Sequence, residues 1–378
     1  MRIMLLAGEA SGDLHAAALA RELKARRPEV ELSGIGGERM AAAGVSLLFD
    51  PTKASVIGFG EALRRLPRFK RWQNEVKAYL RRVRPDALVL VDFGGFNVGV
   101  AEYAHRIGVP AVYYIPPAAW AWGRGRARRL AKACTRIACV LPMEVEVYGQ
   151  AGAEVRFVGH PLLDEVHPRG DREGVRASLG VVPGELLVGL LPGSRRQEIE
   201  SLLPDMLAAA RLLEQRRPGL KWALGLAPTV NRARLEALVA AAGLPVRLVP
   251  GAHAVMEAAD VLMVASGTAT LEAALFGTPM VMVYRVSPLT YALARWLVKV
   301  RHYALPNLVA GEEIIPELVQ EELTPERLAG AVEWFLADPA GRARVSERLR
   351  AAVARLGEPG GAGRAAKIIL EVAEGTGR

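Results

Sequence analysis

The chain contains only two cysteines among its 378 residues, Cys134 and Cys139, in a C-x4-C spacing. That spacing suits neither a disulfide-stabilised secreted domain nor a zinc site. The six histidines form no metal-ligand pattern with one another or with the cysteines. We therefore expect buried free thiols in a reducing compartment, and neither a metal nor another cofactor.

Long apolar runs are also absent. No segment approaches the roughly 18 uninterrupted apolar residues that a membrane-spanning helix requires. The apolar run at the N-terminus is too short for a signal peptide. These absences predict a cytoplasmic protein that does not span the membrane.

The residues that are present favour a folded α/β protein of two domains. Hydrophobic residues make up 51% of the chain and charged residues 24%, which excludes gross disorder. Apolar runs typical of buried strands alternate with helical patterns, as expected for parallel sheets covered by helices. The expected strands are residues 3–7, 87–91, 111–115, 186–191, 221–226, 246–248, 261–264 and 280–283.

The polar, turn-rich stretch at residues 156–171 separates two similar halves of the sequence. We therefore expect an N-terminal domain of residues 1–165 and a second domain of residues 166–345. Residues 346–378 are expected to form a helical segment that packs on the N-terminal domain of the same chain or of a partner. Ligands of such folds bind at the carboxyl ends of the strands.

Positive charge is concentrated in the N-terminal half of a chain with net charge +9. Such a face suits an anionic lipid surface, nucleic acid or plain solvent. We name one part of it the N-terminal patch: Leu63, Leu66 and Phe69, with Arg64, Arg65 and Arg68. An apolar stripe among arginines is typical of an interfacial helix on an anionic membrane. The alternative is a helix that packs this stripe on the protein core.

The first predicted strand ends in Gly8-Glu-Ala-Ser-Gly-Asp13, which opens a helix. The segment lacks the G-x-G-x-x-G fingerprint, and its acids would repel a pyrophosphate, so a nicotinamide cofactor is disfavoured. Glu9 and Asp13 suit sugar hydroxyls or acid-base chemistry. In the alternative, Ser11 or Asp13 only caps the helix.

Asp92 follows the apolar run at residues 87–91, so we place it at the carboxyl end of a buried strand. A carboxylate there suits a general base with a moderately raised pKa. The alternative is an Asx turn that only stabilises the loop.

Two strand-to-helix turns in the second half suit phosphate. The turn at residues 192–195 carries Arg195, which is suited to stabilising a departing phosphate. The turn from Ser266 to Thr270 opens a helix whose N-terminus favours a phosphate, although a plain capped helix has the same pattern. Glu272 follows, where its carboxylate suits a ribose. Together these turns predict a nucleoside diphosphate site.

Seven segments in this order resemble the lipid-A-disaccharide synthase family. They are Ala7–Asp13, Trp120–Trp122, Phe157–Pro161, Leu191–Arg195, Val264–Arg285, Leu305–Gly311 and Pro316–Glu322. The resemblance implies an inverting, metal-independent glycosyltransferase with two facing Rossmann-like domains, the GT-B type.

The implied reaction transfers 2,3-diacylglucosamine from UDP-2,3-diacylglucosamine to the 6-hydroxyl of 2,3-diacylglucosamine 1-phosphate. The products are a β-1,6-linked disaccharide and UDP. The first domain would bind the acceptor and lie peripherally on the inner face of the cytoplasmic membrane, while the second would bind the donor. We expect no nucleic-acid partner, and the sequence does not decide whether the protein forms a homodimer. Domain closure implies a hinge near residues 160–170.

The resemblance also assigns roles to residues. Asp92 matches the acid regarded as the general base, Arg195 the arginine that supports the leaving UDP, and Glu9 a further acid near the reaction. The predicted donor-binding residues are Gly193, Ser194, Ser266, Gly267, Thr268, Ala269, Thr270, Glu272, Asn307 and Gln320. The predicted acceptor or cleft residues are Ser11, Asp13, Asn97, Trp120 and Trp122.

One departure from the family is visible. The family commonly has Ile-Asp-Ala-Pro-Asp-Phe-Asn where this chain has Val91-Asp-Phe-Gly-Gly-Phe-Asn97, so Gly95 replaces the second aspartate. The nearest alternatives are another UDP-sugar transferase or a UDP-sugar 2-epimerase of the same fold. A noncatalytic protein that binds nucleotide and docks on membranes is a further alternative, and a nucleic-acid binder is disfavoured because no recognised module is present.

Overall fold

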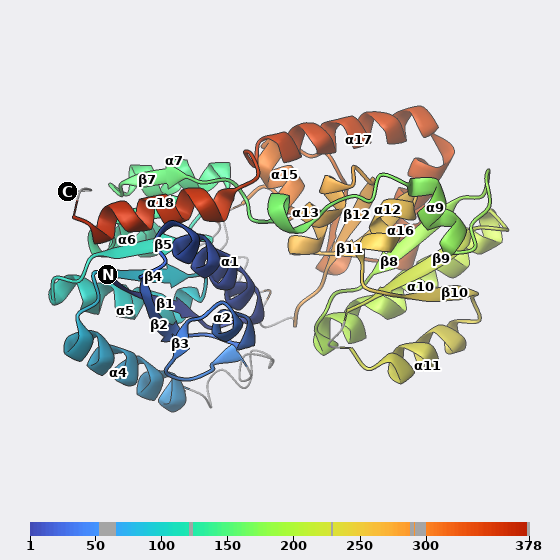
Figure 1. The fold of residues 1–378 in the computed structure, drawn as a ribbon. Coiled ribbons are helices and arrows are strands. Elements are labelled where there is room, and N and C mark those ends of the chain that lie inside the picture. Colours follow the sequence, from blue (N-terminus) through green and yellow to red (C-terminus); the bar gives the residue numbers. More distant parts are fainter. Residues whose placement is uncertain (53–65, 121–123, 228–229, 288–290, 292–299, 376–378) are drawn as a thin grey trace. The chain divides into compact units, whose positions relative to one another are not determined.

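The computed structural model describes residues 1–378 apart from 53–65, 121–123, 228–229, 288–290, 292–299 and 376–378. The chain divides into two compact units (Figure 1). The first contains Met1–Glu165 and Leu356–Arg378, and the second contains Val166–Arg355. The chain therefore passes between the units twice. The second passage lies after residue 355, whereas the sequence placed the last boundary after residue 345.

The first unit is a parallel seven-stranded sheet in the order β3-β2-β1-β4-β5-β6-β7. Its strands are β1 (Arg2–Ala7), β2 (Glu31–Ile35), β3 (Ser46–Leu47), β4 (Ala87–Val91), β5 (Ala111–Tyr114), β6 (Arg136–Cys139) and β7 (Val155–Phe157). All five residues of β4 are buried. A strand covered on both faces needs such a continuous apolar run, which is why the sequence revealed it.

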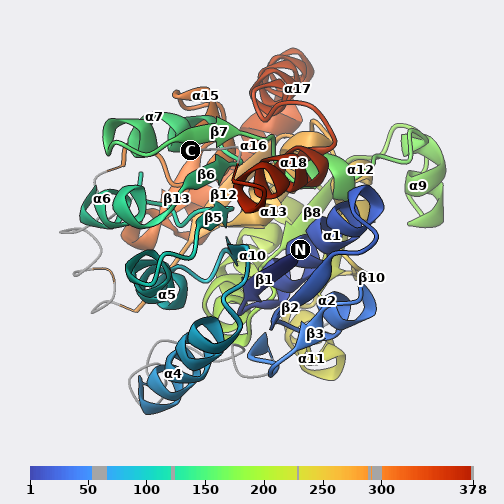
Figure 2. The same ribbon diagram turned by 60° about the vertical axis from the view of Figure 1, so that its left-hand side comes forward.

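Helices cover both faces of this sheet (Figure 2). They are α1 (Ala10–Arg26), α2 (Glu38–Ala42), α4 (Leu66–Val83), α5 (Gly94–Arg106), α6 (Arg124–Ala133), α7 (Pro142–Gln150), α8 (Leu162–Glu165) and α18 (Gly361–Ala373). The C-terminal helix α18 packs beside α1 over β4, β5 and β6 of its own chain. On the opposite face, α4 packs against α5 and α5 against α6.

The last part of residues 1–165 holds the returning C-terminal segment, residues 356–378. The carboxylate of Asp164 accepts hydrogen bonds from the backbone N–H groups of Gly360 at 2.6 Å and Gly361 at 3.2 Å. Gly159 has φ +81°, and a Cβ there would lie 2.9 Å from the carbonyl oxygen of Glu358. Glycine at this position therefore allows α18 to close on the first unit.

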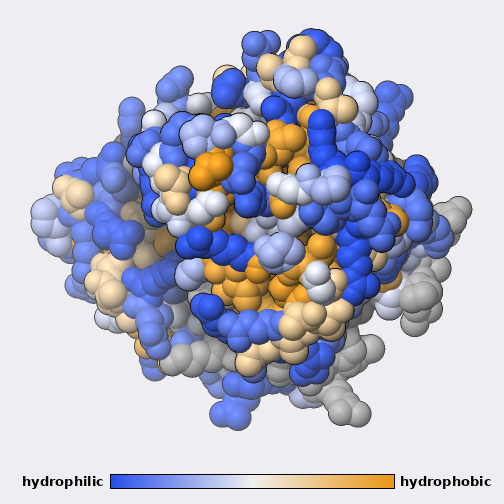
Figure 3. Space-filling view, turned by 90° about the vertical axis from the view of Figure 1, so that its right-hand side faces the viewer, coloured by the Kyte–Doolittle hydropathy of each residue, from blue (hydrophilic) through white to orange (hydrophobic). Residues whose placement is uncertain are grey.

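The second unit is a parallel six-stranded sheet in the order β10-β9-β8-β11-β12-β13. Its strands are β8 (Leu187–Leu191), β9 (Lys221–Leu226), β10 (Val246–Pro250), β11 (Val261–Ala265), β12 (Met280–Tyr284) and β13 (Glu317–Val319). Its helices are α9 (Arg172–Ser178), α10 (Arg196–Arg216), α11 (Arg232–Ala242), α12 (His253–Ala258), α13 (Thr268–Leu275), α15 (Leu305–Ala310), α16 (Pro325–Ala337) and α17 (Pro339–Ala354). The face of the molecule drawn in Figure 3 is mainly hydrophilic, with apolar patches between polar residues.

The predicted α/β class is confirmed, and the strand orders locate where ligands bind. In each unit the order reverses between two neighbouring parallel strands: β1 and β4 in the first, β8 and β11 in the second. The carboxyl ends of such a pair form the ligand-binding crevice of doubly wound sheets. Every candidate turn from the sequence follows one of these four strands.

Within the described ranges, each helix is too short or too polar to cross a bilayer.

Candidate functional site

Asp92 lies directly after β4, at the strand-order reversal of the first unit. Asp92 and Phe93 both adopt a left-handed backbone conformation, with φ of +50° and +51°. This conformation is uncommon for residues other than glycine, and two side chains hold the turn. The carbonyl oxygen of Asp92 accepts hydrogen bonds from Asn97 Nδ2 at 2.8 Å and from the Tyr113 hydroxyl at 2.6 Å.

The Asp92 carboxyl group is half-buried and lies against α1. Burial raises its pKa above the usual range, while a hydrogen bond from the Phe93 backbone, the charge of His15 and a hydrogen bond with Ser11 oppose that shift. The structure thus brings Ser11 to Asp92. A partly desolvated carboxylate held by a fixed turn has the properties of a general base.

The first-turn prediction needs a correction, because the segment after β1 is not an open turn. Helix α1 begins at Ala10, with Glu9 as its exposed N-cap residue. The sequence predicted a turn at residues 8–13 that opens the helix. Glu9 and Ser11 therefore sit at the helix N-terminus and not in a glycine-bounded loop.

Asp13 was predicted to line the acceptor site, and its contacts show instead a structural role. The side chain is only 5% exposed. Its two oxygens accept hydrogen bonds from the N–H groups of Gly37 at 2.7 Å, Arg39 at 3.1 Å and Met40 at 3.1 Å. Asp13 thus caps α2, a different helix from the one that the sequence suggested.

Asn97 is also removed from the acceptor surface. Its side chain is fully buried, and it positions Asp92 through the backbone bond given above. Trp120 is half-buried, and its indole nitrogen has no hydrogen-bond partner within the described part of the chain. Trp122 lies outside the described residues.

In the second unit, the turn after β8 is occupied by a carboxylate of the protein itself, that of Glu198. Gly193 has φ +107°, and the Glu198 carboxylate accepts from the N–H groups of Ser194 and Arg195 at 3.2 Å each. The Arg195 guanidinium also bonds Glu198, at 2.8 Å. The sequence predicted an open cationic turn, but Glu198 occupies it because a capping carboxylate satisfies the same N–H groups.

The turn after β11 is different. Helix α13 starts at Thr268, Gly267 and Thr268 are exposed, and among the described residues no side chain caps this helix. A Cβ at Gly267 would meet no atom within 4 Å. The first N–H groups of a helix lack intrahelical acceptors, so those of Thr268 and Ala269 suit a phosphate.

Two neighbours of this turn are not presented to a ligand as predicted. The Ser266 N–H bonds the carbonyl oxygen of Val283 at 3.0 Å. Thr270 is fully buried, and its hydroxyl donates to the Gly267 carbonyl at 2.8 Å. Thr270 therefore shapes the turn, and the backbone of Gly267, Thr268 and Ala269 is the part of the turn that is left for a ligand.

Glu272 lies one turn further along α13 and pairs with a residue that the sequence did not suggest. His253 Nε2 lies 3.0 Å from Glu272 Oε2, and the hydrogen bond raises the pKa of His253. The His253 ring also packs on Phe276, with ring centroids 5.7 Å apart. The pair fixes one carboxylate oxygen of Glu272 on the helix that follows the turn after β11.

Asn307 and Gln320, predicted to bind the donor, hold loops instead. Asn307 is fully buried, donates to Ile315 and Glu317, and accepts from the N–H groups of Ile314 and Ile315. Gln320 is 7% exposed and exchanges two hydrogen bonds with the backbone of Val286. An amide side chain can both donate and accept hydrogen bonds, so it satisfies the buried backbone N–H and C=O groups of these loops.

The N-terminal patch is described only in part. Leu63, Arg64 and Arg65 lie outside the described residues, and so does the side chain of Leu66. The ring of Phe69 is partly buried against Trp72, Phe93 and Phe96, at 5.7, 5.7 and 6.3 Å between centroids. For Phe69 the structure bears out the alternative, in which the stripe packs on the core.

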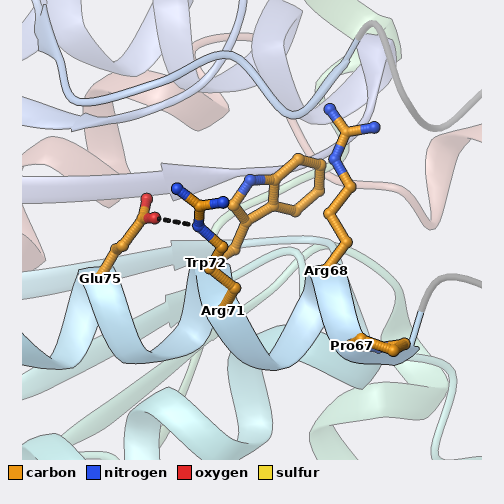
Figure 4. A pocket seen from close by; sticks show the side chains of 5 residues that line it. All are labelled: Pro67, Arg68, Arg71, Trp72 and Glu75. Carbon is orange, nitrogen blue, oxygen red and sulfur yellow. Dashed lines mark hydrogen bonds and ion pairs between the residues drawn. The ribbon is translucent and has the colours of Figure 1, made fainter.

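Arg68 remains on the surface, beside an open hollow of about 520 Å³. Its guanidinium lies over the Trp72 ring, 4.7 Å from the centroid, while Arg71 pairs with Glu75 (Figure 4). Pro67 completes the lining. The hollow combines an aromatic face with two guanidinium groups.

Two Rossmann-like units, the first completed by a returning C-terminal helix, are typical of the GT-B class of fold. The structure resembles UDP-GlcNAc 2-epimerase from Neisseria meningitidis bound to UDP-GlcNAc, with TM-score 0.63, 12% identity, and coverage of 99% of this chain and 100% of that chain. It also resembles Acinetobacter baumannii MurG, with TM-score 0.60, 16% identity, and coverage of 98% and 99%. At such low identities these likenesses establish the fold alone.

Sequence comparison identifies the family. A family model described as lipid-A-disaccharide synthetase matches residues 3–368. The lipid-A-disaccharide synthase of Myxococcus xanthus is 43% identical over 98% of this chain and 97% of its own length, and that of Geobacter sulfurreducens is 41% identical with the same coverage. The chain belongs to the lipid-A-disaccharide synthase family. It is a glycosyltransferase, as the sequence predicted.

Proposed function

We propose that this enzyme transfers 2,3-diacylglucosamine from UDP-2,3-diacylglucosamine to the 6-hydroxyl of 2,3-diacylglucosamine 1-phosphate. The products are the β-1,6-linked disaccharide 1-phosphate and UDP. The observation that carries the proposal is the Asp92 carboxylate, which is partly desolvated at the strand-order reversal of the first unit. As the acceptor oxygen attacks the anomeric carbon, Asp92 takes its proton, and the bond to UDP breaks with inversion.

The donor is assigned to the second unit. The uncapped N-terminus of α13 supports binding of the UDP diphosphate, because its N–H groups and the helix dipole favour an anion. Glu272, fixed by His253, is assigned to the ribose hydroxyls.

Arg195 is assigned to the leaving diphosphate. Its side chain is 76% exposed and pairs with Glu198, and such an exposed ion pair is weak enough for a phosphate to replace the carboxylate. The charges of Arg195 and Glu198 both act on Tyr284 at the end of β12, which supports their location near the ends of β8, β11 and β12. A guanidinium there stabilises charge as it develops on UDP.

The acceptor and the membrane are assigned to the first unit. We infer that the enzyme associates peripherally with the inner face of the cytoplasmic membrane through α4 and the N-terminal patch. The exposed side chains of Arg68 and Arg71 support this, since basic side chains suit an anionic lipid surface.

A product assay tests the proposal. Purified enzyme is incubated with UDP-2,3-diacylglucosamine and 2,3-diacylglucosamine 1-phosphate, and the disaccharide 1-phosphate and UDP are measured by mass spectrometry. We expect both products in equal amounts, and neither when the acceptor is left out. Conversion of the donor without the acceptor would instead indicate an epimerase.

A further inference from the structure

Helix α1 presents two side chains to Asp92. Ser11 and His15 are four residues apart, so they lie on the same face of the helix. Between them, Gly12 brings α1 close to the turn after β4: a Cβ at this glycine would lie 3.8 Å from Asp92 Cβ and 3.6 Å from the Val91 carbonyl oxygen. Ser11 hydrogen-bonds the Asp92 carboxyl group, and the charge of His15 acts on it.

Glu165 holds His15 from the other side. His15 Nδ1 lies 2.8 Å from Glu165 Oε1, and the two side chains are only 14% and 25% exposed. A partly shielded pair is screened less by solvent than a surface ion pair. Because Nδ1 is engaged by Glu165, the ring orientation of His15 is set, and Nε2 is the remaining ring nitrogen.

The other ionisable groups around Asp92 and His15 are either neutral or engaged with backbone groups. Burial and the charge of His15 lower the pKa of His160 to about 3, so His160 is neutral at physiological pH. Asp164 bonds the N–H groups before α18, and Arg364 donates to the carbonyl oxygen of Val158. Among the groups that act on Asp92, His15 is the ionisable side chain that favours the carboxylate.

A buried hydroxyl marks the same location. Tyr114 ends β5, and its hydroxyl is buried without a hydrogen-bond partner among the described residues. Burial raises the pKa of Tyr114. The charges of Glu165 and Asp164 add to this rise, whereas the charge of Arg364 opposes it. An unpaired buried hydroxyl next to Glu165 is a group that a substrate hydroxyl or a water molecule would satisfy.

We propose that His15, held by Glu165, is a positioning residue whose charge keeps the Asp92 carboxylate ionised before it meets the acceptor hydroxyl. This inference rests on the proposed function. During transfer the acceptor oxygen bonds the anomeric carbon, the acceptor proton moves to Asp92, and the electron pair of the broken C–O bond leaves with UDP, so the step balances without a proton from His15. Its effect is on the state of Asp92 before the reaction.

The test compares pH profiles of kcat/KM for the wild type and His15→Gln, with His105→Gln as the matched control on an exposed histidine of α5. Removing the charge near Asp92 raises the pKa of the base. We therefore expect the acidic limb of the His15→Gln profile to move up by about one pH unit. Activity should return toward the wild-type value at high pH, and His105→Gln should match the wild type.

A merely structural role for His15 would lower activity equally at all pH values, and that result, or an unchanged profile, would overturn the inference. A wild type that forms no disaccharide would refute the proposed function instead. In that case the carboxyl pKa of Asp92 is measured directly by 13C NMR of aspartate-labelled protein, assigned with Asp92→Asn. An Asp92 pKa equal in the wild type and in His15→Gln would then overturn the inference independently of turnover.

Discussion

At the scale of single residues, carboxylate side chains have two different roles in this enzyme. Asp13 and Glu198 are carboxylates that cap helices α2 and α10, whereas Asp92 has its charge partly desolvated and its backbone fixed. Neighbours decide the difference: the carboxylates of Asp13 and Glu198 accept hydrogen bonds from N–H groups at the start of a helix, whereas burial raises the pKa of the Asp92 carboxyl group and suits it to take a proton.

Asp92→Asn tests the base. We expect kcat to fall at least about 100-fold, since an amide cannot accept the acceptor proton. Burial raises the pKa of Asp92, so folding favours its protonated form, and the ionised form costs stability at pH values above that pKa. The variant should therefore keep or increase the wild-type Tm at neutral pH, measured by calorimetry. Near-normal turnover would transfer the role to another carboxylate, with Glu9 the first candidate.

Arg195→Ala tests the leaving-group assignment. We expect kcat to fall by about 100-fold or more, because charge on the departing UDP loses its stabilising guanidinium. Arg196→Ala is the matched control, since Arg196 is the next residue and pairs with Glu200 on the helix surface. Equal turnover of both variants in a steady-state assay would argue against a special role for Arg195.

At the scale of elements, the strands and their turns carried most of the predictable information. All residues of β4 and β11 are apolar and buried, so both strands were visible as runs. The short strands β2, β3, β6, β7 and β13 were not expected. Their sequences, ELSGI, SL, RIAC, VRF and ELV, each include polar residues, so no continuous apolar run marks them without their sheet.

Helix α4 carries the proposed contact with the membrane. Reversing the charge at Arg64, Arg65 and Arg68 should reduce binding to anionic phospholipid vesicles by about 100-fold or more, because each basic residue near such a surface adds about 1 kcal/mol. Reversal of Arg81 and Arg82, exposed at the other end of α4, is the control. Cosedimentation that is unchanged by the first set, or reduced equally by both, would refute the assignment.

At the scale of the whole molecule, the two units differ in how the chain builds them. The second unit is one continuous segment, Val166–Arg355, whereas the first requires residues 356–378. Helix α18 in that segment buries Ala365, Ala366 and Ile369 completely. The first unit is therefore incomplete without the last part of the chain.

This difference gives a prediction for fragments. Residues 166–355 should fold alone, unfold cooperatively and bind UDP, because the core and the α13 N-terminus are both contained in them. Residues 1–165 alone should be much less stable, and adding the 356–378 peptide should restore structure. Circular dichroism and UDP titration calorimetry measure both effects, and an unfolded 166–355 fragment would contradict the prediction.

The sequence by itself determined the α/β class, the two halves, the turns after the buried strands and the family. These features depend on local composition, since a doubly covered strand must be apolar and a strand-to-helix turn has its own residue preferences. Only the tertiary structure decided which polar side chains are engaged. His15 meets Glu165 across 150 residues of sequence, and Asp13 meets Gly37 across 24. Hydrogen bonds depend on distance in space, so a motif alone could not separate Asp92 from the acids that only cap a helix.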